Sequence, residues 1–149
     1  MNIRPLERDD LEQATALTKK VFMEFDAPDY SPTGIENFLK FIEAENMYDM
    51  FDSKKLYCYG YYNENEMLGI IATIGRNHIC LLFVDKAHHR RGIATKLFAE
   101  ALKHRNKDEK ITVHSSPYAV PVYRNLGFIA ADDEQLVDGM RFTPMTYDK

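Results

Sequence analysis

One stretch of the chain, residues 78–84, is apolar at nearly every position. It reads His-Ile-Cys-Leu-Leu-Phe-Val, and such a run is typical of a strand that is covered on both faces of a sheet. A loop over residues 85–91, a helix from Gly92 and a short strand over 110–114 follow it. Two neighbouring strands joined by a helix lie parallel, with a right-handed crossover. The sequence therefore predicts an α/β fold with helices on both faces of its sheet.

Strands and helices are also expected elsewhere along the chain. Alternating or aromatic-rich runs predict strands, which we expect over residues 1–5, 56–62, 67–74, 128–130 and 140–147. Apolar residues at helical spacing predict helices, which we expect from Asp9 or Asp10 to about Phe25, from Ser31 or Thr33 through Ile42, and from Pro117 to Leu126. Residues 43–54 are expected to be irregular. The result is one domain over residues 1–149 with a mixed, mostly antiparallel central sheet.

The composition is that of a globular protein in a reducing compartment. Of the 149 residues, 45% are hydrophobic and 28% are charged, which excludes a disordered chain. No apolar run approaches the roughly 20 residues of a membrane span, and the start of the chain is too polar for a secretory signal. The two cysteines, Cys58 and Cys80, are too few for a disulfide framework. We therefore expect a cytoplasmic protein with no membrane partner.

Basic side chains are concentrated in one short segment of an acidic chain. The formal net charge is −4, yet residues 86–107 hold 7 basic and 1 acidic side chains, a net of +6. The overall charge argues against a nucleic-acid partner, because affinity for nucleic acid rests on positive surface charge. The local excess predicts an anionic ligand at this segment.

The basic loop leads into a helix whose first turn carries small residues. Gly92 and Ala94 would let a pyrophosphate approach the unpaired N–H groups of that turn, and Arg90 and Arg91 would add positive charge. The alternative is a solvated basic turn in which Gly92 serves only the backbone. The spacing matches neither the dinucleotide-binding nor the P-loop glycine pattern, which disfavours a nicotinamide dinucleotide or a P-loop nucleotide.

At this junction the chain resembles the GNAT-type N-acetyltransferases. Members of that family carry Gln/Arg-x-x-Gly-x-Gly/Ala, and this chain has Gly92 and Ala94 at the matching positions, with His89 where Gln or Arg is usual. Members also often show Asn-x-x-Ala-x-x-x-Tyr-x-x-x-Gly-Phe; here the matching residues are Ser116, Ala119, Tyr123, Gly127 and Phe128, with serine in place of asparagine. The ending over residues 139–145 also looks like the last strand of these proteins. The resemblance spans nearly the whole chain.

The resemblance implies the acyl-CoA N-acyltransferase fold and transfer of an acetyl group from acetyl-CoA to a primary amine. The transfer would proceed by direct attack in a ternary complex, and the acceptor would be a small molecule or a peptide amine. It implies that acetyl-CoA is held by Phe83, Val84, His89, Arg90, Arg91, Gly92, Ile93, Ala94, Thr95, Ser116, Ala119 and Tyr123. A CoA-binding regulatory or interaction module that has lost catalysis is the alternative, and a homodimer is left open.

Two residues are candidates for the proton transfers. The family match places Tyr123 beside the sulfur, where a phenol with a pKa of about 10 could protonate the departing thiolate. His78 lies 14 residues before Gly92, at the position of the catalytic glutamate of histone-acetylating relatives, and imidazole is a competent base near pH 7. Strand alternation predicts Cys80 and Leu82 on the same face as His78. His78 could instead merely hydrogen-bond a neighbour, with Glu66, His114 or water as the base.

In the family, the loop between the first two helices lines the acceptor site. Phe25, Tyr30 and Phe38 are therefore expected to contact the acceptor. A metal site is not expected, because the adjacent His88 and His89 point apart and no further ligands stand near the remaining histidines and cysteines.

Overall fold

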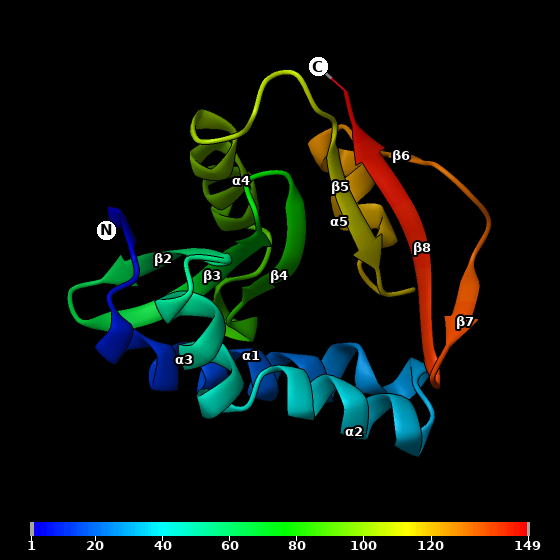
Figure 1. Ribbon diagram of the computed structural model, residues 1–149, viewed down its shortest axis with the longest axis horizontal. Helices are drawn as coiled ribbons and strands as arrows, with labels where there is room; N and C mark the ends of the chain where they lie inside the picture. The colour runs from blue at the N-terminus through cyan, green and yellow to red at the C-terminus, as the bar shows by residue number, and fades with distance from the viewer. Residues whose placement is uncertain (1, 149) are drawn as a thin grey trace.

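The computed structural model describes residues 2–148, and Figure 1 shows its mixed sheet with helices on both faces. The strands lie in the order β1-β2-β3-β4-β5-β8-β6, and β7 pairs with β8. Their bounds are β1 Asn2–Pro5, β2 Leu56–Asn63, β3 Glu66–Ile74, β4 His78–Val84, β5 Ile111–Ser115, β6 Ile129–Ala130, β7 Gln135–Val137 and β8 Met140–Tyr147. Among the described strands only β4 and β5 pair in parallel. The mostly antiparallel sheet with one parallel crossover is confirmed.

Two groups of helices cover the sheet. Their bounds are α1 Leu11–Phe25, α2 Pro32–Phe41, α3 Ala44–Asp52, α4 Ile93–Lys103 and α5 Val120–Leu126. In Figure 1, α1, α2 and α3 run along the lower edge, and α4 and α5 lie above them. The buried side chains accordingly form two clusters, one shared by the sheet with α1–α3 and one shared by the sheet with α4 and α5. We call these the α1 cluster and the α4 cluster.

The structure differs from the sequence-based expectation in three places. Residues 44–52 form α3, which the acidic composition hid; Met47 is fully buried, and Tyr48, Met50 and Phe51 pack against the α1 cluster. β7 is an additional edge strand, joined to β8 by the left-handed residues Asp138 and Gly139. That pair is a hairpin signal in its own right. The last helix begins at Val120, not at Pro117.

A β-bulge in β4 reverses the alternation of its side chains. Ala72 pairs with Leu81 and Thr73 with Ile79, so Cys80 is the extra residue. Ile79 therefore lies in the α4 cluster, while Leu81 lies in the α1 cluster. The predicted sharing of one face by Cys80 and Leu82 is wrong, because Cys80 packs against the α1 cluster and Leu82 against the α4 cluster.

The parallel strands β4 and β5 separate soon after they meet. They pair only through His78 with Thr112 and Ile79 with Val113, and Figure 1 shows them diverging beyond that point. The carboxyl-terminal half of β4 thus has no partner strand on its β5 side. This opening in the sheet positions the cavities described next.

Candidate active site

Two adjoining cavities lie at the opening between β4 and β5. The larger has a volume of about 480 Å³ and reaches the start of α4; the smaller, of about 330 Å³, lies between the sheet and α1–α2. Five residues line both: Asp26, Leu82, Phe83, Ala119 and Tyr123. The two cavities therefore meet at a shared wall that contains one carboxylate and one phenol.

The larger cavity includes the amino-terminal end of α4. Gly92 is the N-cap with a φ of 77°, and no side chain caps the amides of the first turn. A Cβ at Gly92 would have no atom within 4 Å, so the space over this turn is open. Arg90 is also left-handed, with a φ of 62°. Open amides, the positive end of the helix dipole and an adjacent guanidinium fit a phosphate group.

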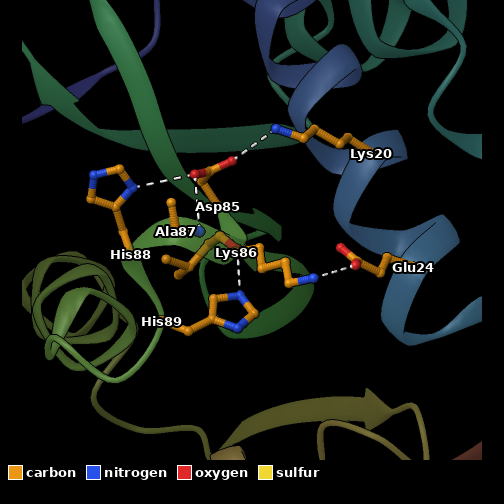
Figure 2. A network of polar contacts seen from close by, with 8 residues as sticks. Lys20, Glu24, Asp85, Lys86, Ala87, His88 and His89 are labelled. Atoms are coloured by element: carbon orange, nitrogen blue, oxygen red, sulfur yellow. Dashed lines mark hydrogen bonds and ion pairs between the residues drawn. The ribbon is translucent and has the colours of Figure 1, made fainter.

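Figure 2 shows how the basic loop after β4 is held against α1. The Asp85 carboxylate accepts hydrogen bonds from Lys20 Nζ at 3.1 Å and from the Ala87 amide at 3.3 Å, and it lies 3.2 Å from His88 Nδ1. Lys86 Nζ lies 2.8 Å from a carboxylate oxygen of Glu24. Partial burial acts to raise the pKa of Asp85, but the hydrogen bonds from Lys20 and His88 outweigh it and the pKa lies below its ordinary value.

This network decides which basic groups remain for a ligand. Lys86 is paired with Glu24, so its charge is partly neutralised. Arg90 and Arg91 form no ion pair with any residue in the described part of the chain. Arg90 lines the larger cavity, whereas Arg91 is exposed outside it.

His89 links the loop to the end of β4. Its Nε2 atom lies 2.7 Å from the carbonyl oxygen of Val84. The Phe25 ring packs 5.0 Å from the His89 ring and 5.0 Å from the Tyr118 ring, measured between centroids. Phe25, expected to contact the acceptor, thus packs beside the larger cavity, while Tyr30 and Phe38 line the smaller one.

Tyr123 projects from α5 into the shared wall and is 5% exposed. Burial raises the pKa of its phenol well above the ordinary value, and the charges of Asp26, Cys80 and Tyr30 raise it further. The hydroxyl therefore keeps its proton throughout the neutral range and can act as a donor.

Asp26 is the site residue that the sequence reasoning missed. It follows the last residue of α1 and is 7% exposed. Burial raises its pKa to about 6; a hydrogen bond from Ser116 opposes that effect and the charge of Asp29 adds to it. In the sequence, the one local sign that Asp26 could be buried is its place between apolar residues, Phe25 before it and Ala27-Pro28 after it.

His78 lies in the smaller cavity at the start of β4. Its Nδ1 atom is 2.8 Å from Thr112 Oγ1, and its ring packs edge-on against His114 at 5.1 Å. Burial lowers the pKa of His78, and the neighbouring His114 lowers it further, so the ring is neutral at pH 7. The sequence left open whether His78 merely hydrogen-bonds a neighbour, and such a bond to β5 is present. It engages Nδ1 and does not involve Nε2.

The remaining expected residues divide between the two cavities. The larger is lined by Phe83, Val84, His89, Arg90, Gly92, Ile93, Ala94, Thr95, Ala119 and Tyr123. Ser116, expected beside the coenzyme, lines the smaller cavity. His114 also lines the smaller cavity, while Glu66 lines neither. Within residues 2–148 there is no group of three or more His, Cys, Asp or Glu side chains placed to hold a metal ion.

The match to known proteins agrees with this geometry. The family model described as the acetyltransferase (GNAT) domain matches residues 26–149. The chain belongs to the GNAT acetyltransferase family. No protein with a curated description matches it at a significant level of sequence similarity. In the described part of the chain, no helix combines the length and apolar character needed to cross a membrane.

Solved structures share the fold at low sequence identity. A GCN5-related N-acetyltransferase from Rhodopseudomonas palustris superposes with a TM-score of 0.81 at 20% identity, covering 98% of this chain and 94% of that one. The PaiA N-acetyltransferase from Thermoplasma acidophilum, in complex with coenzyme A, gives 0.77 at 19% identity, covering 98% of each chain. The spermidine N-acetyltransferase from Vibrio cholerae, in complex with CoA and spermine, gives 0.65 at 20% identity, covering 97% and 93%.

Proposed function

We propose that this protein transfers the acetyl group of acetyl-CoA to a primary amine by direct attack in a ternary complex. The observation that carries the proposal is the meeting of two cavities at Tyr123, one reaching an uncapped helix N-terminus and the other containing a buried carboxylate. Membership of the GNAT family and the CoA complexes among the similar structures support it. A cytoplasmic setting belongs to the same proposal.

The larger cavity is the proposed site of acetyl-CoA. The pyrophosphate would lie on the first turn of α4 at Gly92, with Arg90 supplying positive charge. The pantetheine arm would run along the unpaired side of β4, past Phe83 and Val84, toward Tyr123. A backbone N–H of this segment aimed at the thioester oxygen would stabilise the tetrahedral intermediate, and one such donor is typically worth about 3–4 kcal/mol.

Tyr123 is the proposed acid for the departing thiolate. Its raised pKa keeps the phenol protonated at neutral pH, so a proton is present beside the thiolate as it departs. His78, the proton acceptor expected from the sequence, stays a prediction; its lowered pKa supplies the neutral ring that a base requires.

Direct transfer is favoured over an acyl-enzyme intermediate. Burial raises the pKa of the Cys58 thiol to about 12 and raises that of Cys80 as well, so neither forms the thiolate that a nucleophile requires. The Cys80 thiol also donates to the Ala72 carbonyl at 3.5 Å.

The proposal is tested by changing Gly92 to valine. The larger side chain would project into the open space over the first turn, and calorimetry should show loss of acetyl-CoA binding. Gly75→Val is a matched control, because Gly75 has a similar φ of 65°, also has open space at its Cβ position, and lies in the turn between β3 and β4. Unchanged affinity in a folded Gly92→Val protein would contradict the placement.

Release of free thiol from acetyl-CoA in a panel of primary amines separates the enzyme from the alternative. A CoA-binding module without catalysis would bind acetyl-CoA in calorimetry but release no thiol above the uncatalysed rate with any amine.

A further inference from the structure

We propose that Asp26 receives the ammonium group of the acceptor and takes its first proton, and that the acceptor is a small primary amine with a single positive charge and an apolar, preferably aromatic, substituent. This inference rests on the proposed function and names the substrate class of that same site.

The position of Asp26 supports its proposed role as the group that receives the ammonium and takes its proton. Asp26 and Tyr123 both line the larger and the smaller cavity, whereas His78 lines only the smaller one. A group that lies on both sides can contact an amine in the smaller cavity at the point where it meets a thioester in the larger. The Asp26 side chain is buried, with 7% of its surface exposed, so it is held at this wall by the residues packed around it. A carboxylate attracts a cation, which a neutral imidazole does not.

The charges around the smaller cavity support an acceptor with a single positive charge. Among its lining residues, all within the described chain, Asp26 is the one carboxylate, and lysine and arginine are absent. One carboxylate neutralises one ammonium group. A second ammonium, as in a polyamine, would lose its water without gaining an opposite charge, which is costly.

Aromatic rings make up a large part of the wall of the smaller cavity, beside aliphatic residues such as Ile74, Ile79 and Val113. Phe22 stacks on Phe38 with ring centroids 3.9 Å apart and meets the edge of Tyr30 at 5.4 Å. Phe38 also contacts Phe83 at 6.0 Å. These rings favour an apolar substituent, and an aromatic one above all, because ring pairs gain energy beyond the area they bury.

The β7–β8 hairpin forms part of the wall of the smaller cavity. Met140, the first residue of β8, lines the smaller cavity. The turn before it docks on α2, where the Ser31 amide donates to the Gly139 carbonyl at 3.3 Å and the Asn37 side chain donates to the Asp138 carbonyl at 3.1 Å. A cavity of about 330 Å³ suits a compact amine better than a long chain.

The proton count of the proposed step balances. The ammonium gives one proton to the Asp26 carboxylate, and the nitrogen lone pair forms the C–N bond at the thioester carbon. The C–S bond breaks as the intermediate collapses, and the thiolate takes the Tyr123 proton. The surplus proton on the amide nitrogen returns to the phenolate, and Asp26 releases its proton to water. Each turnover yields one amide, one free thiol and one released proton.

The surroundings of Asp26 are consistent with this role. Asp29 and Tyr30 follow it on the next turn, Tyr123 and Ser116 approach from the α5 side, and His78 and His114 lie in the smaller cavity. His88, His89 and Arg90 line the larger cavity, which Asp26 also lines. With a pKa of about 6, the carboxylate is charged at pH 7 but is a stronger base than an ordinary aspartate. The pH profile of kcat/KM for wild type should therefore show an acidic limb near 6.

The test compares three acceptors and two variants. Thiol release is measured with 2-phenylethylamine, spermidine and a lysine-containing peptide, and acetyl-CoA affinity is measured by calorimetry. We expect kcat/KM for 2-phenylethylamine to exceed the other two by at least about tenfold. Asp26→Asn keeps the side-chain shape and should lower kcat/KM for this amine by roughly 10²–10⁴-fold without changing acetyl-CoA affinity. Asp29→Asn, which changes a neighbouring carboxylate, should keep the wild-type plateau and move the acidic limb slightly to lower pH.

Three outcomes would overturn parts of the inference separately. A preference for spermidine or the peptide would overturn the acceptor class, and this comparison needs wild type alone. If Asp26→Asn keeps the wild-type kcat/KM and its acidic limb does not move, Asp26 is not the group that takes the proton. Loss of that limb in His78→Ala would then assign the base to His78. Acetyl-CoA binding without turnover of any amine would overturn the proposed function, and the inference with it.

Discussion

The Nε2 atom of His89 lies 2.7 Å from the carbonyl oxygen of Val84. This contact joins the last residue of β4 to the loop that leads into α4, and so fixes the distance between the strand and the uncapped helix N-terminus. His89 stands where the family usually has Gln or Arg. A ring nitrogen that contacts a backbone carbonyl can hold the loop against the end of β4.

Replacing His89 with alanine should weaken acetyl-CoA binding. The loop would lose one hydrogen bond worth about 1 kcal/mol, so the Kd should rise roughly fivefold. His89→Gln supplies another N–H donor and should recover much of the affinity. Calorimetry on both variants checks this, and equal loss in the two would argue that ring packing against Phe25 matters more than the hydrogen bond.

Replacing Tyr123 with phenylalanine removes only the hydroxyl. Because the ring and its packing against Phe128 stay, acetyl-CoA affinity and folding should be unchanged. Turnover should fall by roughly 10²–10⁴-fold, the usual worth of a positioned acid. The measurement is kcat under conditions where chemistry is rate-limiting; a wild-type kcat there would exclude Tyr123 as the acid.

Asp26→Asn should stabilise the protein at neutral pH. Burial raises the folded-state pKa from 3.8 to about 6, so the folded protein binds a proton more tightly than the unfolded chain does. The protonated Asp26 carboxyl group therefore contributes to the free energy of unfolding. This contribution is fully present below about pH 4 and is lost as the pH rises through about 6. At one pKa unit per roughly 1.4 kcal/mol, the ionised carboxylate costs up to about 3 kcal/mol at pH 7, and asparagine removes that cost.

Denaturant unfolding at pH 7 and at pH 4 measures this effect. The free energy of unfolding of Asp26→Asn should exceed that of wild type at pH 7, and the difference should shrink at pH 4. A variant that is less stable at both values would show that the Ser116 hydrogen bond outweighs the burial of the charge.

Replacing Gly34 with alanine should displace the β7–β8 hairpin. A Cβ on Gly34 would overlap the carbonyl oxygen of Gly139, a backbone atom that cannot move alone. We expect a loss of about 1–3 kcal/mol in the free energy of unfolding. Because Met140 would move with the hairpin, the KM for the amine should rise more than the KM for acetyl-CoA. Thr33→Ala, at the exposed neighbouring position, is the control and should leave both KM values near wild type.

Local patterns in the sequence were enough to predict the crossover unit and part of the site. The apolar run of β4, the basic loop and Gly92 are neighbours in the chain, so their spacing carries the geometry of the helix N-terminus directly. Tyr123 was found from the resemblance to the family motif that ends at Gly127 and Phe128, and it lies in α5. Residues that lie within one turn or one strand can be placed from their order alone.

Only the tertiary structure brought Asp26 and Tyr123 to one wall. The carboxyl end of α1 and the start of α5 are far apart in sequence, and no periodic pattern connects them. The bulge at Cys80 was equally hidden, since alternation along a strand assumes a regular ladder and one extra residue reverses every side chain beyond it. Whether a carboxylate is solvated or buried depends on what packs around it, and the neighbours of Asp26 come from separate segments of the chain.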